Sequence, residues 1–419
     1  MNTATGRNRK RVAAYLAVLL IALASTVAWA EIDGITGTTF NLTAKSAHIV
    51  TPDGNSLLIW GYATNASTVA QYPGPTLIVN QGDTVIINLQ NQLTVPTSIV
   101  FPGQTGVAAT GGSAGLLTKE ASAGGGTVSY TFTASQPGTY LYNSGTRPDL
   151  QVEMGMVGAL IVRPPVSTQA YNHADTTFDT EFLFLLTEMD PRFHDLIEQG
   201  RMAEVDTTTF FPVYWFINGR CGPDTLADSY VSWLPSQPYS CAPMMNPGDR
   251  LLMRLVGGGR DPHPFHFHGN NATIVARDGR MLESQRGVSG PDLAESDFTL
   301  TAYPGGTVDA IYTWTGAKLG WDVYGHQPGD ALAPNEYAPD HGKPFPVALP
   351  SQQSLTYGEH FGGGPFLGTP GAILPGTFSL NPDGAYMYMW HSHTEKEIVN
   401  DNVFPGGMMT MLMIMARGN

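Results

Sequence analysis

The second half of the chain repeats, in the same order, the short apolar elements of its first half. In each half a Gly-Asp turn precedes an apolar run, an aromatic run follows a Gly, and a run that begins with Met closes the series. The repeated elements are 82–89 and 248–252, 137–142 and 383–388, and 156–161 and 409–414. An internal repeat of this kind predicts two homologous folding units with one shared architecture.

The repeated elements have the composition of β-strands. They are short runs rich in β-branched and aromatic side chains, and Gly and Pro (48 and 31 of 419 residues) separate them. The clearest runs are 76–79, 84–89, 128–132, 139–142 and 157–162. Short strands at regular spacing favour an all-β fold built of antiparallel sandwiches. Only the apolar spacing at 193–205 predicts a helix.

The repeat divides the chain into two domains. We expect a first domain at 31–165, a polar linker at 166–177 and a second domain at 178–419. The second domain is larger because of two insertions, at about 219–246 and 316–383, both containing many Gly and Pro residues. Loops of this length usually act as functional covers or contact surfaces, or else are poorly ordered.

The N-terminal segment predicts export. Basic residues within 7–11 precede an apolar run at 12–24, and Ala28-Trp29-Ala30 places small residues where a signal peptidase cleaves. We therefore expect 1–30 to be a secretory signal peptide, with an uncleaved anchor helix as the alternative. After cleavage the protein would be free of the membrane, in the periplasm or outside the cell.

Charge and cysteine content narrow the classes of function. The chain has 35 acidic and 21 basic side chains, a net charge of −14, and therefore lacks the basic surface that a nucleic-acid partner requires. Cys221 and Cys241 are the two cysteines, and export to an oxidising compartment predicts a disulfide between them. A redox or metal-binding thiol is the alternative, although neither cysteine belongs to a CxxC motif.

Five of the eleven histidines fall in two short groups. His266 and His268 form one His-x-His pair, His391 and His393 form another, and His263 lies three residues before the first pair. Residues two apart in a strand point to the same face, so neighbouring strands would bring four imidazoles together. Such a donor set suits copper, zinc, iron or nickel, and the order of affinities favours copper. Hydrogen-bonded histidines on a polar rim are the alternative.

The same residues carry a resemblance to a known family. Tyr-Pro-Gly-Pro-Thr at 72–76, Gly-Asp at 82–83, His-Pro-Phe-His-Phe-His-Gly at 263–269 and Trp-His-Ser-His at 390–393 resemble segments of multicopper oxidases of the laccase type. The likeness extends over nearly all of the chain after residue 30. It implies two tandem cupredoxin-like Greek-key β-sandwich domains, with long loop insertions in the second, and copper as the cofactor.

The first domain lacks ligands that this resemblance implies. The family carries two further His-x-His pairs there, which complete a trinuclear copper cluster. Val100 and Pro102 stand at the positions of the first pair, and Asn143 and Gly145 at those of the second. Val, Pro and Gly side chains cannot bind a metal, so half of the eight-histidine cluster is missing.

The resemblance also implies a mononuclear blue copper site, and that site is altered. Its ligand positions hold His263, Ser392, Glu397 and Met408. Ser cannot supply the thiolate that a blue site needs. His263 and Glu397 would then form a second, harder site or orient the remaining ligands. The predicted metal-binding residues are His263, His266, His268, His391, His393, Glu397 and Met408.

Two further clusters receive other interpretations. The methionines within 409–415 alternate with Thr, Leu and Ile, and we interpret them as the buried side of a strand rather than as a copper(I) patch. His326, His341 and His360 lie in the second insertion beside several carboxylates. They would become extra ligands if the insertion folded over the histidine pairs.

The sequence is compatible with two functions. The first is an exported copper-binding protein of multicopper oxidase type, with a reduced, non-blue histidine site for one or two copper ions in the second domain. Any activity would be a slow copper-dependent oxidoreductase reaction without the blue-copper cysteine. The second is a non-catalytic cupredoxin scaffold for protein or surface contacts, with its metal role lost or structural. A small-molecule reductant and an oligomeric assembly are compatible with the first.

Overall fold

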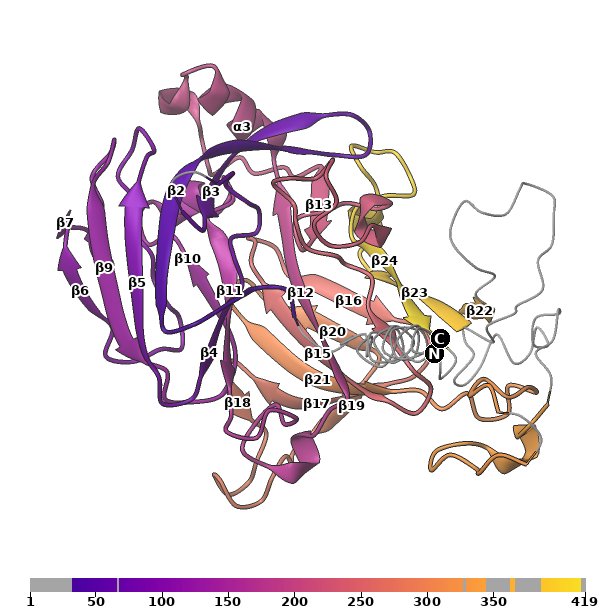
Figure 1. The fold of residues 1–419 in the computed structure, drawn as a ribbon. Coiled ribbons are helices and arrows are strands. Elements are labelled where there is room, and N and C mark those ends of the chain that lie inside the picture. The colour runs from indigo at the N-terminus through magenta and orange to yellow at the C-terminus, as the bar shows by residue number, and fades with distance from the viewer. Residues whose placement is uncertain (1–31, 66–67, 327–328, 344–361, 366–385, 416–419) are drawn as a thin grey trace, which may run out of the picture. The chain divides into compact units, whose positions relative to one another are not determined.

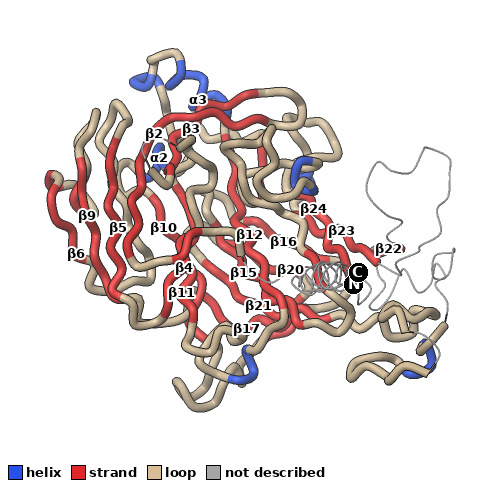
Figure 2. The backbone as a smooth tube through the Cα atoms, in the orientation of Figure 1, coloured by secondary structure: helices blue, strands red, loops and turns tan. Residues whose placement is uncertain are grey.

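The computed structural model (Figures 1 and 2) describes residues 32–65, 68–326, 329–343, 362–365 and 386–415. The signal peptide predicted at 1–30 lies outside these residues, as do His360 and much of the second insertion. No helix in the described part of the chain has the length and apolar character needed to cross a membrane.

Strands from the first half form two main sheets around one core. Five strands pair in the order β3-β2-β5-β9-β6 and four in the order β1-β4-β11-β10, with β7 and β8 as a separate hairpin. The bounds are β1 Ile35–Thr36, β2 Thr39–Val50, β3 Ser56–Ala63, β4 Leu77–Asn80, β5 Thr84–Asn91, β6 Ala108–Gly111, β7 Ser113–Ala114, β8 Lys119–Glu120, β9 Thr127–Thr133, β10 Gly138–Asn143 and β11 Val157–Arg163. Phe40 and Ile87 of the first sheet share a buried cluster with Leu77 and Leu160 of the second, which makes this half a sandwich.

Strands from the second half form two larger sheets (Figure 1). One has the order β13-β12-β15-β21-β17-β18 with β19 beside β17, and the other β14-β24-β23-β16-β20 with β22 beside β23. The bounds are β12 Thr180–Met189, β13 Tyr214–Ile217, β14 Met244–Met245, β15 Arg250–Gly257, β16 His263–Phe267, β17 Ala272–Arg277, β18 Arg280–Met281, β19 Glu295–Asp297, β20 Thr299–Ala302, β21 Thr307–Thr313, β22 Gly363–Pro365, β23 Tyr386–Ser392 and β24 Met409–Ile414. Phe184 and Leu255 from the first sheet and Phe265 and Trp390 from the second share one core.

The predicted all-β class and the five predicted strands are confirmed, but the sheets are not purely antiparallel. β2 pairs with β5, β4 with β11, β12 with β15 and β14 with β24 in parallel. Periodicity along one strand contains no information on the direction of its neighbour, so the sequence pattern could not reveal these pairs.

A third core joins the two halves. Leu141 and Ile161 from the first half pack with Leu185 and Val256 from the second, although no described strand pairs across the division. A buried ion pair lies in the same region, where the guanidinium of Arg254 contacts carboxylates and a hydroxyl. Its Nε lies 2.8 Å from Glu181 Oε2, and its Nη1 lies 3.0 Å from Thr139 Oγ1 and 3.8 Å from Asp309 Oδ1. The domain boundaries proposed above stay a prediction.

Helices are few in the described residues, and the one predicted helix is shorter than expected. α3 spans Pro191–Glu198, with the Asp190 side chain accepting from the Arg192 N–H at its start. Gly200 follows in a left-handed conformation (φ 74°) and ends the helix before the predicted limit at 205. The remaining short helices are α2 Pro148–Gln151, η1 Ala174–Thr176, η2 Met202–Glu204, η3 Asp224–Leu226, η4 Ala338–Asp340 and η6 Glu395–Ile398.

The disulfide predicted between Cys221 and Cys241 is not formed, because both are free, buried thiols. Cys221 packs in the core shared by the two halves, whereas Cys241 packs between the sheets of the second half. Cys241 Sγ lies 2.8 Å from the carbonyl oxygen of Ile217. Burial raises the pKa of both thiols, that of Cys241 to about 12, so both stay protonated near neutral pH. Compartment and spacing alone could not show that the two side chains enter different cores.

Candidate metal centre

The two His-x-His pairs lie on adjacent strands of one sheet. β16 and β23 are antiparallel, and His266 stands directly opposite His391. Phe265 on β16 and Trp390 on β23 point to the opposite face, into the core. Because side chains alternate along a strand, burial of these aromatic residues turns the histidine pairs outward. The predicted convergence of the two pairs on one face is what the structure shows.

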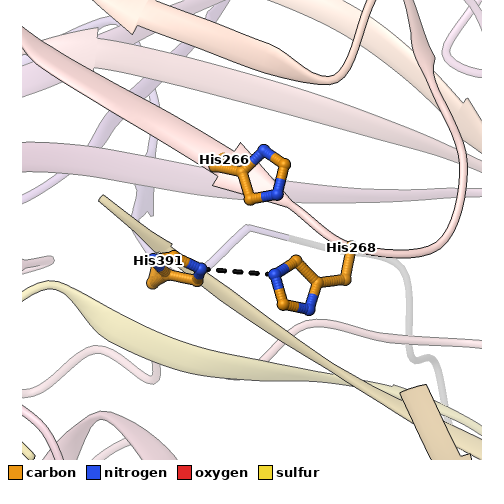
Figure 3. Close-up of side chains that lie close together, drawn as sticks. All are labelled: His266, His268 and His391. Atoms are coloured by element: carbon orange, nitrogen blue, oxygen red, sulfur yellow. Dashed lines mark hydrogen bonds between the residues drawn. The ribbon is translucent and has the colours of Figure 1, made fainter. Parts of the chain in front are cut away.

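Three of the four imidazoles form a compact group. One ring nitrogen from each of His266, His268 and His391 lies within 4.8 Å of the others. Figure 3 shows the three rings gathered where the strands meet, with the His391 and His268 Nε2 atoms 3.3 Å apart. Two imidazole nitrogens that each lie about 2.0 Å from one metal ion can adopt this separation.

The fourth histidine borders this group. His393 is exposed, and its ring centroid lies 5.0 Å from that of His266 and 5.7 Å from that of His391. The backbone N–H of His393 donates to the Pro264 carbonyl at 2.8 Å, which fixes the main chain at the edge of β16. His393 therefore lies at the edge of the group, in ring contact with two of its three members.

Hydrogen bonds at the Nδ1 atoms determine which ring nitrogen of each histidine carries the lone pair that a metal would bind. His268 Nδ1 lies 3.3 Å from the Gly362 carbonyl oxygen, and His391 Nδ1 lies 2.8 Å from the Ser392 carbonyl oxygen. Since a carbonyl only accepts, each Nδ1 donates a proton and each neutral ring keeps its lone pair on Nε2. The two lone pairs then face each other across 3.3 Å, an arrangement that a bound cation stabilises. His266 Nδ1 is held by the Thr299 hydroxyl at 3.0 Å.

The electrostatic environment keeps these imidazoles neutral. Burial, followed by the neighbouring imidazoles, lowers the pKa of His266 to about 4. Burial also lowers the pKa of His268 and of His391. At pH 7 the rings therefore offer lone pairs rather than protons, which is the state that a metal ligand needs.

The opposite face of β16 holds a different arrangement, which we call the Glu188–His263–Glu397 triad. His263 is fully buried, its Nδ1 lies 2.9 Å from Glu397 Oε2, and its Nε2 lies 2.8 Å from Glu188 Oε2. Burial lowers the pKa of His263, but the two carboxylates outweigh this effect and raise it to about 9. His263 is thus an imidazolium ion at neutral pH, with both ring nitrogens engaged.

The triad lies where the resemblance implied a blue copper ligand set. The Ser392 hydroxyl donates to Glu397 Oε2 at 2.6 Å, and the Ser392 N–H donates to the carbonyl of the buried residue Met408 at 2.9 Å. The Ser392 hydroxyl and the His263 ring therefore both contact Glu397, and the Met408 backbone lies beside them. Glu397 thus accepts hydrogen bonds from the Ser392 hydroxyl and from the protonated His263 ring.

Glu188 is the member of the triad that the sequence analysis missed. It lies on β12, in the run Thr-Glu-Phe-Leu-Phe-Leu-Leu-Thr-Glu-Met, and its Oε1 accepts the backbone N–H groups of Arg260 (2.5 Å) and Asp261 (3.0 Å). A carboxylate inside an apolar strand requires a buried partner, and this signal could have identified it.

The two ligand-poor segments of the first half are also adjacent. Val100 and Asn143 exchange two backbone hydrogen bonds, with N···O distances of 2.8 and 3.2 Å. The Val100 side chain approaches Gly145 so closely that a Cβ on the glycine would lie 2.7 Å from it. The two segments thus lie side by side, with the aliphatic Val100 side chain at a position where the family carries an imidazole.

The methionines at the C-terminal end of the chain lie on the histidine-bearing face, which corrects the interpretation of 409–415 as the buried side. Thr410, Leu412 and Ile414 are the buried side chains of β24, and the methionines between them are partly exposed. Met411 stands opposite Met389 on β23. The methionine face, as we call it, comprises Met244, Met387, Met389, Met409, Met411, Met413 and Met415.

Known sequences match both halves of the chain. Two family models, each described as multicopper oxidase, match residues 58–167 and 236–315. A copper resistance protein A homolog of Pseudomonas syringae pv. tomato is 28% identical over 289 residues, which are 60% of this chain and 45% of that protein. An L-ascorbate oxidase of Cucurbita maxima is 34% identical over 140 residues, 33% of this chain and 22% of that protein. The chain thus spans less than half the length of these relatives.

Solved structures share the fold. A blue copper oxidase from Nitrosomonas europaea matches with a TM-score of 0.57 and 19% identity, covering 91% of this chain and 86% of that one. The multicopper oxidase mgLAC matches with a TM-score of 0.57 and 18% identity over the same shares. These likenesses show the fold of tandem cupredoxin-like sandwiches, and the two family models agree with it. The chain belongs to the multicopper oxidase family.

Proposed function

We propose that this protein is an exported copper-binding member of its family, with a non-blue copper site at His266, His268, His391 and His393. The observation that carries the proposal is the pair of Nε2 atoms of His268 and His391, which face each other across 3.3 Å. Membership of the multicopper oxidase family implies copper as the cofactor. The site would hold one or two ions, and export rests on the signal peptide predicted at 1–30.

The donor chemistry of the site fits copper. Neutral imidazole is a good ligand for copper, and among the divalent first-row metals copper binds such sites most tightly. Burial and mutual repulsion keep the three clustered rings unprotonated. Thr299, the Gly362 carbonyl and the Ser392 carbonyl hold the Nδ1 atoms, so each ring is oriented before a metal arrives.

The chain's other residues argue against a blue site. Ser392 stands where the thiolate would be, and neither cysteine takes its place. Cys241 Sγ contacts the Ile217 carbonyl oxygen at 2.8 Å, and Cys221 packs in the core that joins the two halves. The Glu188–His263–Glu397 triad already places a positive charge, the His263 imidazolium, in that position. We propose that this imidazolium replaces the second metal ion, which removes the electron-entry point of the family.

The methionine face supports copper over zinc. Thioether sulfur is a soft ligand that selects copper(I), and zinc has no comparable affinity for it. Met409 stands opposite His391, so the thioethers begin next to the imidazoles. A surface of this kind can retain copper(I) beside the histidine site. When bound at the imidazoles, copper would supply one-electron redox chemistry, and any oxidation of a small-molecule reductant would be slow.

A non-catalytic scaffold is the second candidate. The close contact of Val100 with Gly145 favours it, because aliphatic packing has replaced the first half's contribution to the cluster. In that case the outward histidine pairs would bind metal weakly or only serve contacts with a partner.

Copper binding separates the two candidates. The wild-type chain should bind copper tightly, measured by equilibrium dialysis with metal analysis. A His268→Ala/His391→Ala variant should lose that binding and keep its far-ultraviolet circular dichroism, since both side chains lie outside the core. His48→Ala is the matched control, because His48 is an exposed histidine whose Nε2 contacts Glu198 at 2.8 Å. Unchanged copper stoichiometry and affinity in the double variant would exclude this site and favour the scaffold.

A further inference from the structure

We propose a second metal site, for a divalent cation of the zinc class, formed by Asp322, His326, Glu336 and His341 in the loop that follows β21. One ligand atom from each of these four side chains lies within 4.8 Å of all the others. The group shares no residue with the cluster around His266. Two imidazoles and two carboxylates form a donor set that Zn²⁺ binds in tetrahedral geometry.

The distances show how closely the four side chains converge. His326 Nδ1 lies 3.1 Å from Asp322 Oδ2 and 3.2 Å from Glu336 Oε2. His341 Nδ1 lies 2.7 Å from Glu336 Oε1, and the two imidazole centroids are 4.7 Å apart. Glu336 therefore bridges the two rings, and Asp322 faces the same ring nitrogen of His326.

Burial and charge make this group unusual. The side chains of Asp322 and Glu336 are 1% and 2% exposed, so two carboxylates are removed from water together. Among the described residues, the salt-bridge partners of both are the histidines alone, while the nearby Lys343 pairs with Asp340. Two buried negative charges need a compensating cation, because desolvation of an unpaired carboxylate costs several kcal/mol. One divalent cation would balance both carboxylate charges.

Backbone groups fix the ligands in advance. Asp322 Oδ1 accepts the Tyr324 N–H at 2.9 Å, and Asp322 Oδ2 accepts the Gly342 N–H at 2.8 Å. Glu336 Oε2 accepts the Ala333 N–H at 2.9 Å. Such bonds to the ligating groups hold the carboxylates in one orientation without neutralising them.

The tautomer of His341 also favours a metal ion at this position. Its Nε2 lies 3.0 Å from the Asp330 carbonyl oxygen, which can only accept, so Nε2 is the donor. In the neutral ring the lone pair is then on Nδ1, directed at Glu336 Oε1 from 2.7 Å. A lone pair facing a carboxylate is repulsive unless a proton or a metal ion lies between them. Metal-ligating histidines commonly use this carbonyl-anchored tautomer.

The proposed site would anchor the second insertion to the core. Trp321 and Val323 flank Asp322 in sequence and are buried in the core of the second sandwich. Glu336 and His341 come from the next turn of the loop, which includes η4. A cation held by both segments would cross-link them. The same insertion includes Gly362, whose carbonyl oxygen contacts His268.

The test uses the full chain, stripped of metal with a chelator and titrated with Zn²⁺ alone. Bound zinc is counted by equilibrium dialysis, and thermal unfolding is followed by tryptophan fluorescence. The background is the His268→Ala/His391→Ala variant, so that zinc at the first centre does not contribute. We expect one equivalent of zinc and a rise in Tm in this background. Adding His326→Ala and His341→Ala should lower the affinity by roughly 100-fold or more and abolish the Tm rise, since loss of even an orienting group costs about 10- to 100-fold.

A second variant guards against misfolding. Asp322→Asn keeps the shape of the side chain and one of the two oxygen acceptors that receive the Tyr324 and Gly342 N–H groups, and its circular dichroism checks the fold. Made in the same background, Asp322→Asn should fold and bind zinc more weakly. His48→Ala in that background should leave both the zinc affinity and the rise in Tm unchanged. Equal zinc stoichiometry and equal stabilisation with and without His326 and His341 would overturn the proposal. So would a background variant that binds no zinc, because the group would then be a proton-linked set of ion pairs only.

Discussion

The Glu188–His263–Glu397 triad predicts a specific dependence of stability on pH. Glu397→Gln keeps the size of the side chain and an oxygen that can accept from Ser392, and it removes the charge that faces His263 Nδ1 at 2.9 Å. With one carboxylate left, the pKa of His263 should fall from about 9 toward its ordinary value of 6.5. The change therefore tests whether the imidazolium ion contributes to the stability of the fold.

The size of the stabilisation follows from the raised pKa of His263. Raising the pKa of His263 from 6.5 to about 9 corresponds to about 3 kcal/mol of stabilisation, since each unit is worth 1.36 kcal/mol. The group is buried, so solvent screening does not reduce this value strongly. Because the folded-state pKa is the higher one, the contribution is fully present below pH 6.5 and is lost as the pH rises through about 9. Removing one of two carboxylates should cost about 1–3 kcal/mol below pH 6.5 and much less at pH 9.5.

The assay is urea unfolding of metal-free protein at pH 6, 8 and 9.5, followed by tryptophan fluorescence. Wild type should lose stability from pH 6 to 9.5 relative to Glu397→Gln, so that the gap between the two narrows. Glu395→Gln is the control, because Glu395 is an exposed carboxylate in the same short helix η6. A gap that stays constant across this range would refute the assignment of a charged His263.

Three further predictions concern the other parts of the account. The Ser392→Cys/Glu397→His variant should bind copper together with His263 and turn blue, because Ser392 Oγ and His263 Nδ1 both lie within 2.9 Å of Glu397 Oε2. A folded, copper-replete variant that stays colourless would contradict this prediction. Met389→Leu with Met411→Leu should weaken copper(I) retention in a chelator competition assay. The free energy of unfolding should change by less than about 1.5 kcal/mol, since both side chains are only partly buried. Unchanged retention would exclude the methionine face as a copper(I) surface. Arg254→Met should destabilise the fold by about 3–5 kcal/mol in urea unfolding, because it leaves Asp309 buried without its cation and leaves Glu181 paired only with Arg163 among the described residues. A loss below about 1 kcal/mol would show that the Arg254 ion pair is dispensable.

Strand positions were predictable because burial imposes a period of two on the sequence. The same period could not show which side of a strand is buried. In β24 both alternating sets are hydrophobic enough for a core, and the structure buries Thr410, Leu412 and Ile414 rather than the methionines. The histidine pairs escaped this ambiguity, since two pairs in register converge whichever way the strands run.

The rest of the site depended on contacts between segments far apart in the chain. Glu188 meets His263 across 75 residues, and only the tertiary fold reveals the partner. His326 and His341 were noticed in the sequence, but Asp322 and Glu336 complete their group only because the loop turns back on itself. The free state of Cys221 and Cys241 likewise follows from the cores that the two side chains enter.

The most direct test of the proposed function is spectroscopy of copper-loaded wild-type protein, with the metal content determined on the same sample. We predict copper bound at the imidazoles of His266, His268, His391 and His393, an electron paramagnetic resonance spectrum typical of nitrogen-ligated copper(II), and no intense thiolate-to-copper band at about 600 nm. The His268→Ala/His391→Ala variant should lose this spectrum. An intense blue absorption in the wild-type protein, or a copper spectrum that is unchanged in the double variant, would contradict the account.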